Sequence, residues 1–168
     1  MNKETKDTLS RRDFVKGGIA LAGTVFCFSG GAREAVARSN ALGLPLLTEK
    51  SLNQKFAEAR VAGALRKLAS DIKPNPKGWL KNKYSLTDLQ NRAINTIPET
   101  QWAEIKRILT FVEENRGASL IVDISETKVA ETAAAVTSSL PCRAKIKVYS
   151  EALVGPTTVK AEAHLETA

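Results

Sequence analysis

Histidine and cysteine are almost absent from this sequence. Its 168 residues contain one histidine and two cysteines. Zinc, haem and iron–sulfur sites usually need several histidine or cysteine ligands, and this chain does not supply such a set. The glycine-rich loops that bind nucleotides and the nucleophile elbow of hydrolases are missing from the sequence as well. The sequence therefore predicts a protein that holds no cofactor of its own, and it argues against an enzyme.

Three residues remain as candidates for chemistry. Cys142 lies in the segment SLPCRAK, where the neighbouring Arg143 would favour a thiolate, but we interpret it as a half-buried small residue. His164 lies in an alternating segment that predicts it on the face opposite Leu165. Asp123 follows a short apolar run. An enzyme that uses Asp123, Cys142 or His164 is therefore the least favoured of our hypotheses.

The overall composition is that of an ordinary globular protein. Apolar residues make up 43% of the chain and charged residues 26%, which is enough for one hydrophobic core. The formal net charge is +7, and residues 38–168 carry 19 Lys and Arg against 14 Asp and Glu. The modest positive excess suits nucleic acid, an anionic membrane or an acidic protein, and it identifies none of them.

The first 37 residues have the three-part order of a secretory signal peptide. Residues 1–16 are polar and charged, and residues 17–31 are uncharged and moderately apolar. This apolar run of fifteen residues is shorter than the roughly twenty that a membrane-spanning helix needs. Ala35 and Ala37 then form an A-x-A cleavage signal. We expect cleavage near Ala37, and retention of the segment as an anchor stays open.

The charged part of this segment carries a specific motif. Ser10 to Lys16 reads SRRDFVK. It resembles the twin-arginine translocation (Tat) signal, in which Ser-Arg-Arg is followed by any residue, Phe, an aliphatic residue and Lys. The resemblance assigns the transport signal to Arg11, Arg12, Phe14 and Lys16. It implies that the protein folds before export, that the Tat translocon is a partner, and that the mature chain is periplasmic or otherwise exported from a bacterial cytoplasm.

The rest of the chain predicts a linker-like arm over residues 38–50 and a single small α+β domain over residues 51–168. Within this domain, residues 51–116 have the period of amphipathic helices, and residues 118–168 are richer in alternating segments. No internal repeat and no low-complexity tract interrupts either part. We therefore expect one core, built where a helical layer covers a small sheet.

Three amphipathic helices are predicted in series. The first spans residues 51–72 with Ser51 as its cap, and the prolines and glycine of residues 73–78 end it at the strongest internal boundary. The second begins at Ser85, and the third begins with Pro98 as its first residue. Their predicted buried faces are Val61, Leu65, Leu68 and Ile72; Leu86, Leu89, Ala93 and Ile97; and Trp102, Ile105, Leu109 and Val112.

The C-terminal part predicts a β-α-β-β unit that forms a small mixed sheet. A buried strand is expected over residues 119–124, followed by a helix over 126–140 and strands over 144–149 and 157–166, with a hairpin turn at Gly155. A parallel crossover would join the first two strands.

The start of the predicted helix over residues 126–140 has two interpretations. The sequence of residues 123–127, DISET, resembles the D-x-S-x-[ST] metal-adhesion loop of von Willebrand A domains. That fold needs a long doubly wound sheet, and too little chain follows Thr127 to build one. We therefore interpret Ser125 as a helix N-cap, and we expect no metal there.

A basic stretch runs from Arg60 to Lys83, with seven Lys and Arg against one acidic residue. Trp79 lies in the same stretch, so Trp79, Lys81 and Lys83 are candidates for docking on an anionic membrane surface or an acidic protein. The export signal argues against nucleic acid as the partner. The structural alternative is a solvated basic face with Trp79 in the core.

These observations favour two functions. The first is a non-catalytic accessory or escort subunit that crosses the membrane with a cofactor-containing exported enzyme. It is motivated by a transport signal for folded cargo on a domain with no ligand set of its own. The alternative is a stand-alone periplasmic domain that binds a small ligand or the cell envelope.

Overall fold

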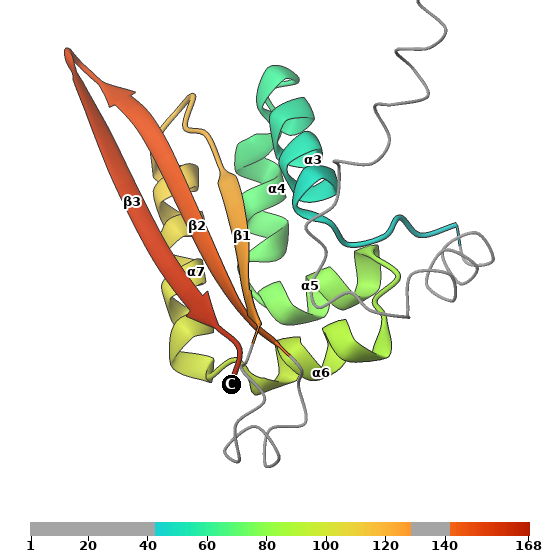
Figure 1. Cartoon of the computed structure of the whole chain (residues 1–168). Helices are drawn as coiled ribbons and strands as arrows, with labels where there is room; N and C mark the ends of the chain where they lie inside the picture. Colours follow the sequence, from blue (N-terminus) through green and yellow to red (C-terminus); the bar gives the residue numbers. More distant parts are fainter. Residues whose placement is uncertain (1–42, 129–141) are drawn as a thin grey trace, which may run out of the picture.

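The fold comes from a computed structural model that describes residues 43–128 and 142–168. The segment 1–37, with the predicted transport signal and cleavage site, lies outside the described residues. Within the described ranges, five helices precede three strands (Figure 1). They are α3 (Glu49–Val61), α4 (Leu65–Ile72), α5 (Pro76–Lys83), α6 (Asp88–Thr96), α7 (Glu99–Glu114), β1 (Ile121–Lys128), β2 (Cys142–Val154) and β3 (Thr157–Glu166).

The three strands form one sheet in the order β1-β2-β3, and the helices pack against one of its faces (Figure 1). The predicted α+β class is therefore confirmed. Both strand pairs are antiparallel, with Val122 opposite Val148 and Val148 opposite Ala163. The predicted parallel crossover and mixed sheet are wrong, because each strand lies beside the next one along the chain with reversed direction. The predicted hairpin at Gly155 is confirmed.

β1 is longer than the sequence predicted. Val122 and Ile124 are buried, whereas Asp123, Ser125 and Thr127 are exposed, which is the period of two of a strand with one solvated face. Residues 126–128 therefore belong to β1, and the remainder of the predicted helix 126–140 lies outside the described residues. Ser125 consequently caps no helix, and the DISET segment is strand rather than metal-binding loop.

The single helix predicted over residues 51–72 is two helices. α3 ends at Val61, α4 begins at Leu65, and Gly63 between them has a φ of 69°. The amides of Gly63 and Ala64 donate to carbonyls in the last turn of α3, which is the hydrogen-bond pattern of a Schellman motif. Val61 is 91% exposed as a result, so its predicted place on the buried face is wrong.

The break at Gly63 yields a stability prediction. A Cβ at this position would meet no atom within 4 Å, so the cost of substitution comes from the backbone alone. We expect Gly63→Ala to lower the free energy of unfolding by about 1 kcal/mol, because a left-handed conformation is unfavourable for residues with a Cβ. Gly63→Asn should lower the free energy of unfolding by less, since asparagine tolerates this conformation. Urea denaturation measures both, and equal stability of wild type and Gly63→Ala would contradict this account.

The helix starts lie one to three residues from the predicted positions, and side chains cap α3 and α6. Thr48, not Ser51, caps α3, and Thr48 and Ser51 exchange side chain to backbone hydrogen bonds. Thr87 and Gln90 form the same reciprocal pair at α6. Pro98 is the N-cap of α7 rather than its first residue.

The predicted break at residues 73–78 contains the start of a further helix. Asn75 caps α5 by accepting a hydrogen bond from the Gly78 amide at 2.9 Å, and Pro76 occupies the first helical position. The prolines therefore end α4 and begin α5. α5 packs on α7 within the same layer.

The described buried residues form one apolar cluster between the helices and the sheet. The predicted stripe of α7 is confirmed, because Trp102, Ile105, Leu109 and Val112 are 1% to 7% exposed. Leu47 from the predicted arm is also buried, and its carbonyl accepts a hydrogen bond from the buried Gln90 side chain. No helix among residues 43–128 and 142–168 is long and apolar enough to span a membrane.

Candidate functional site: the open edge of the sheet

The outer edge of β1 is closed by side chains of α3. Asn53 donates from Nδ2 to the Val122 carbonyl at 2.7 Å, and its Oδ1 accepts from the Val122 amide at 2.9 Å. The Glu49 carboxylate accepts from the Ile124 amide at 2.8 Å. These side chains form hydrogen bonds with the backbone groups that a free edge strand would offer to another chain.

The outer edge of β3 is open over most of its length. Backbone groups of an antiparallel strand point alternately toward a neighbour and away from it. The Thr167 amide donates toward β2, to the Ala144 carbonyl, whereas the Glu166 amide donates outward to the Gln101 side chain of α7. By this alternation, the even-numbered residues from 158 to 164 direct their amides and carbonyls outward. No described strand pairs with this edge.

A groove of about 610 Å³ lies between β3 and α7, next to the open edge. Its apolar lining comes from Ile108, which is buried, and from Phe111 and Ala161, which are half-buried. Thr110 and side chains of both charge signs complete the lining: Glu104, Lys106, Arg107, Glu114, Lys160 and Glu162. The open edge and the groove together offer both backbone hydrogen bonds and an apolar floor to a partner.

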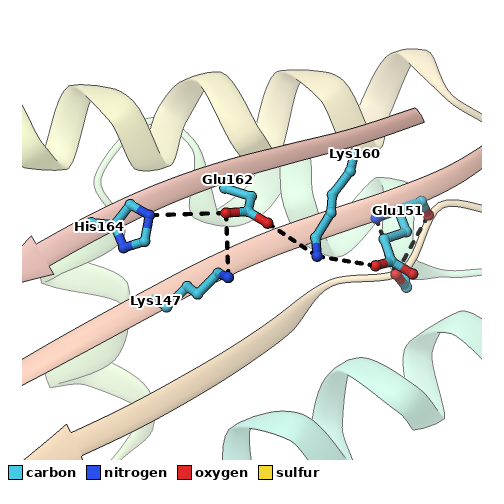
Figure 2. Close-up of polar contacts among 6 residues, drawn as sticks. Lys147, Glu151, Lys160, Glu162 and His164 are labelled. Carbon is cyan, nitrogen blue, oxygen red and sulfur yellow. Dashed lines mark hydrogen bonds and ion pairs between the residues drawn. The ribbon is translucent and has the colours of Figure 1, made fainter. Parts of the chain in front are cut away.

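The solvated face of the sheet carries a row of ion pairs (Figure 2). Glu162 lies 3.0 Å from Lys160 Nζ and 3.3 Å from Lys147 Nζ, and Lys160 also reaches Glu151 at 3.5 Å. The hydrogen bond from Lys160 is the largest cause that lowers the pKa of the Glu162 carboxyl below its ordinary 4.5, followed by Lys147. Glu162 in turn raises the pKa of Lys160. Both ammonium groups also lie over the Tyr149 ring, within 5.5 Å of its centroid.

This charge cluster makes stability depend on pH. A carboxyl whose pKa is lower in the folded state stabilises the fold above its unfolded pKa, and this contribution is lost as pH falls through the folded value. We therefore expect Glu162→Gln to lower the melting temperature at pH 7, with a difference from wild type that shrinks below about pH 4.5. The exposed Glu114, changed to Gln, is the matched control. An unchanged melting temperature of Glu162→Gln at pH 7 would contradict the prediction.

The β2–β3 hairpin extends beyond the end of β1 (Figure 1). The residues at the tip of this hairpin are uncharged. Leu153, Val154 and Val159 there are 72%, 49% and 39% exposed. The tip therefore continues the open edge as a partly apolar surface.

The predicted docking residues Trp79, Lys81 and Lys83 differ in burial and in their contacts. Trp79 is only 9% exposed and packs edge-on against Tyr84 at 5.9 Å, so the interpretation of Trp79 as a core residue is confirmed. Burial also raises the pKa of the Tyr84 hydroxyl to about 12. Lys81 donates to the Asn95 side chain of α6, and Lys83 is exposed. Docking through Lys81 and Lys83 stays a prediction.

Two of the candidates for chemistry, Asp123 and His164, line the same surface depression of the sheet. Asp123 and His164 both face solvent from the sheet, in the same row, with Lys147 between them. Two strand spacings separate their backbones by roughly 10 Å. His164 is 3.9 Å from Glu162, and the backbone of Cys142 begins β2. No group of three or more potential metal ligands occurs within the described ranges.

The core contains a cavity of about 80 Å³ where every described helix and strand meets. All of its lining residues are apolar, and they include Phe56, Trp79, Trp102, Val148 and Leu165. An empty apolar cavity of this size costs on the order of 2 kcal/mol of stability. Water does not fill such a space readily, because the wall turns no polar surface toward it.

The open edge, the groove and the cavity were not found by sequence analysis. The alternation of β3 predicts a strand, but it carries no signal for which strand lies at the edge. Comparison with known proteins adds no further indication, because no family model, no curated protein and no solved structure matches this chain. The function is therefore argued from the site itself.

Proposed function

We propose that this protein is a small exported binding subunit without a catalytic centre, which escorts or assists a cofactor-containing enzyme exported by the Tat route. The resemblance of Ser10–Lys16 to a Tat signal supports the export step. The observation that carries the binding role is the open β3 edge beside the α7 groove. One edge of the sheet is closed by Asn53 and Glu49, while the other offers its backbone to a partner.

The partner segment is an extended strand of the enzyme. Addition of a strand to a sheet edge gains affinity from main-chain hydrogen bonds and specificity from pockets for alternate side chains. The outward amides and carbonyls between residues 158 and 164 supply the hydrogen bonds. Ile108, Phe111 and Ala161 supply an apolar floor for the side chains that point toward α7. We expect a partner strand with small apolar residues on that side and mixed charges at its borders.

Affinity purification from the periplasm tests this proposal. A C-terminally tagged chain should be recovered with its N-terminus at Arg38 and with one stoichiometric enzyme subunit. The double variant Arg11→Lys/Arg12→Lys should leave both proteins in the cytoplasm, because the Tat signal needs the arginine pair. Recovery of the exported chain without a partner would overturn the escort role and leave the export role intact.

A pair of tryptophan variants locates the binding surface. Ala161→Trp adds a large side chain inside the groove, whereas Ala103→Trp adds the same side chain at an exposed position of α7 outside it. We expect the first to reduce the recovered partner at least tenfold and the second to leave it unchanged. Equal recovery with both variants would place the partner elsewhere.

The core cavity favours a second candidate function, a stand-alone exported domain that binds a small ligand. Export of the tagged chain, followed by its purification without a partner, would favour this second candidate over the escort role. A ligand-dependent rise in melting temperature would then distinguish it from an inert protein.

A further inference from the structure

We infer that the core cavity is a binding site for the apolar end of a small organic anion, which enters beside Leu80 on α5. This inference goes beyond the escort role and names the ligand class for the second candidate function, and it depends on neither export nor a partner enzyme. It rests on three features of the described residues: an apolar interior space, a single half-exposed residue in its wall, and two lysines beside that residue.

The chemistry of the cavity selects an apolar group. Its volume is about 80 Å³, and its wall contains no charged side chain and no hydroxyl or amide side chain. An engineered cavity of about 150 Å³ with such a lining stays dry and binds benzene. The smaller space here suits a short or branched aliphatic group. Polar recognition, if the ligand has any, must therefore occur outside the cavity.

The position of Leu80 identifies the mouth. Every other residue that lines the cavity is buried, whereas Leu80 is half-buried. The cavity therefore comes nearest to solvent at α5, where Pro76 and Trp79 form the adjoining wall. α5 is only eight residues long, and Lys81 connects it to Asn95 of α6 by a hydrogen bond of 2.9 Å.

The charge at the mouth selects an anion. Lys77 and Lys83 are three residues before and after Leu80, so they flank it on the same side of the helix. α5 contains no acidic residue, and neither lysine forms an ion pair with a described carboxylate. A carboxylate at the mouth would meet both ammonium groups while its hydrocarbon end occupied the cavity.

The two tryptophans of the chain provide a direct measurement. Trp79 and Trp102 are the only tryptophans in the sequence, and both line the cavity. Occupancy changes the surroundings of both indoles, so tryptophan fluorescence reports binding without a label. The probe is 3-methylbutanoate, titrated into the full chain, and the matched probe of opposite charge is 3-methylbutylammonium. We expect a saturable change with the carboxylate and a response at least tenfold weaker with the ammonium compound.

Two sets of variants distinguish the contribution of the cavity wall to binding from that of the lysines at its mouth. Val148→Leu adds a methylene to the cavity wall and should weaken binding at least tenfold, whereas Val112→Leu changes a buried valine outside the wall and should not. The surface variant Lys77→Gln/Lys83→Gln should weaken carboxylate binding at least fivefold, and Lys55→Gln/Lys67→Gln is its charge-matched control.

Three results would overturn the inference. They are the absence of a saturable fluorescence change with 3-methylbutanoate, an equal response to both probes, and undiminished binding by the Lys77→Gln/Lys83→Gln variant. The lysine variants lie on the helix surface, so the inference stays testable even if Val148→Leu fails to fold. Circular dichroism of each variant establishes that it is folded. An escort role that fails in the co-purification leaves all of these expectations unchanged.

Discussion

Replacing Leu109 with alanine is expected to remove about 3 to 5 kcal/mol from the free energy of unfolding. Leu109 is 2% exposed on the buried face of α7, and its side chain forms part of the cavity wall. Truncation at this position enlarges a space that is already incompletely filled. The cost of such truncations rises with the volume of the resulting cavity, so the upper part of the usual range applies.

The size of this effect matters because domains of this kind are stable by only about 5 to 15 kcal/mol. Leu109→Ala should therefore shift the midpoint of urea denaturation strongly, with little change in slope. Leu153→Ala is the matched control, since Leu153 is 72% exposed at the hairpin tip and should change stability by less than about 0.5 kcal/mol. A loss below about 1 kcal/mol in Leu109→Ala would show that α7 does not pack as described.

Replacing Asn53 with alanine is expected to lower the free energy of unfolding by about 2 kcal/mol. The side chain makes two hydrogen bonds to Val122, one to its amide and one to its carbonyl. Both backbone groups lie at the edge of β1 beneath α3, and the substitution leaves both without their partner. Unpaired backbone groups at partly buried positions account for most of the expected cost.

The neighbouring Gln54 offers the matched control for Asn53. Its amide is exposed and bonds only to Glu58 on the same helix, so Gln54→Ala should change stability by less than about 0.5 kcal/mol. Amide hydrogen exchange gives a second measurement, because the Val122 amide should exchange faster in Asn53→Ala than in wild type. Unchanged protection of that amide would contradict the proposed closure of the β1 edge.

Sequence patterns correctly predicted those elements that are determined by residues close together in the chain. The buried stripe of α7 follows from apolar residues at helical spacing, and Trp102, Ile105, Leu109 and Val112 are buried as predicted. The hairpin at Gly155 follows from a turn signal between two alternating segments, and it is confirmed. Both features involve residues close together in the sequence, so the sequence alone contains their determinants.

Two of the sequence-based predictions are wrong, and in both cases the same residues are compatible with two local structures. The run of apolar residues over 51–72 is compatible with one helix, but the left-handed conformation of Gly63 ends α3 and turns the chain into α4. The DISET segment offers both a helix cap and an alternating strand. Pairing with β2 decided between them, because eight ladder positions from Ile121 to Lys128 outweigh one capping hydrogen bond.

The candidate site was less predictable than the fold. Asn53, Gln101 and Phe111 have no motif in the sequence, and each acquires its role from an element far along the chain. Strand order decides which edge is open, and the packing of α3 and α7 decides which edge is closed. Neither is encoded in the residues near the edge.

The sequence by itself determined the α+β class, the basic charge, the helical stripe of α7 and the terminal hairpin, because each depends on composition or on neighbours a few residues apart. Only the tertiary structure decided the antiparallel order, the open edge of β3 and the cavity under α5. These features arise from contacts between distant segments such as Asn53 with Val122, whose free energy depends on how the layers pack and not on any local pattern.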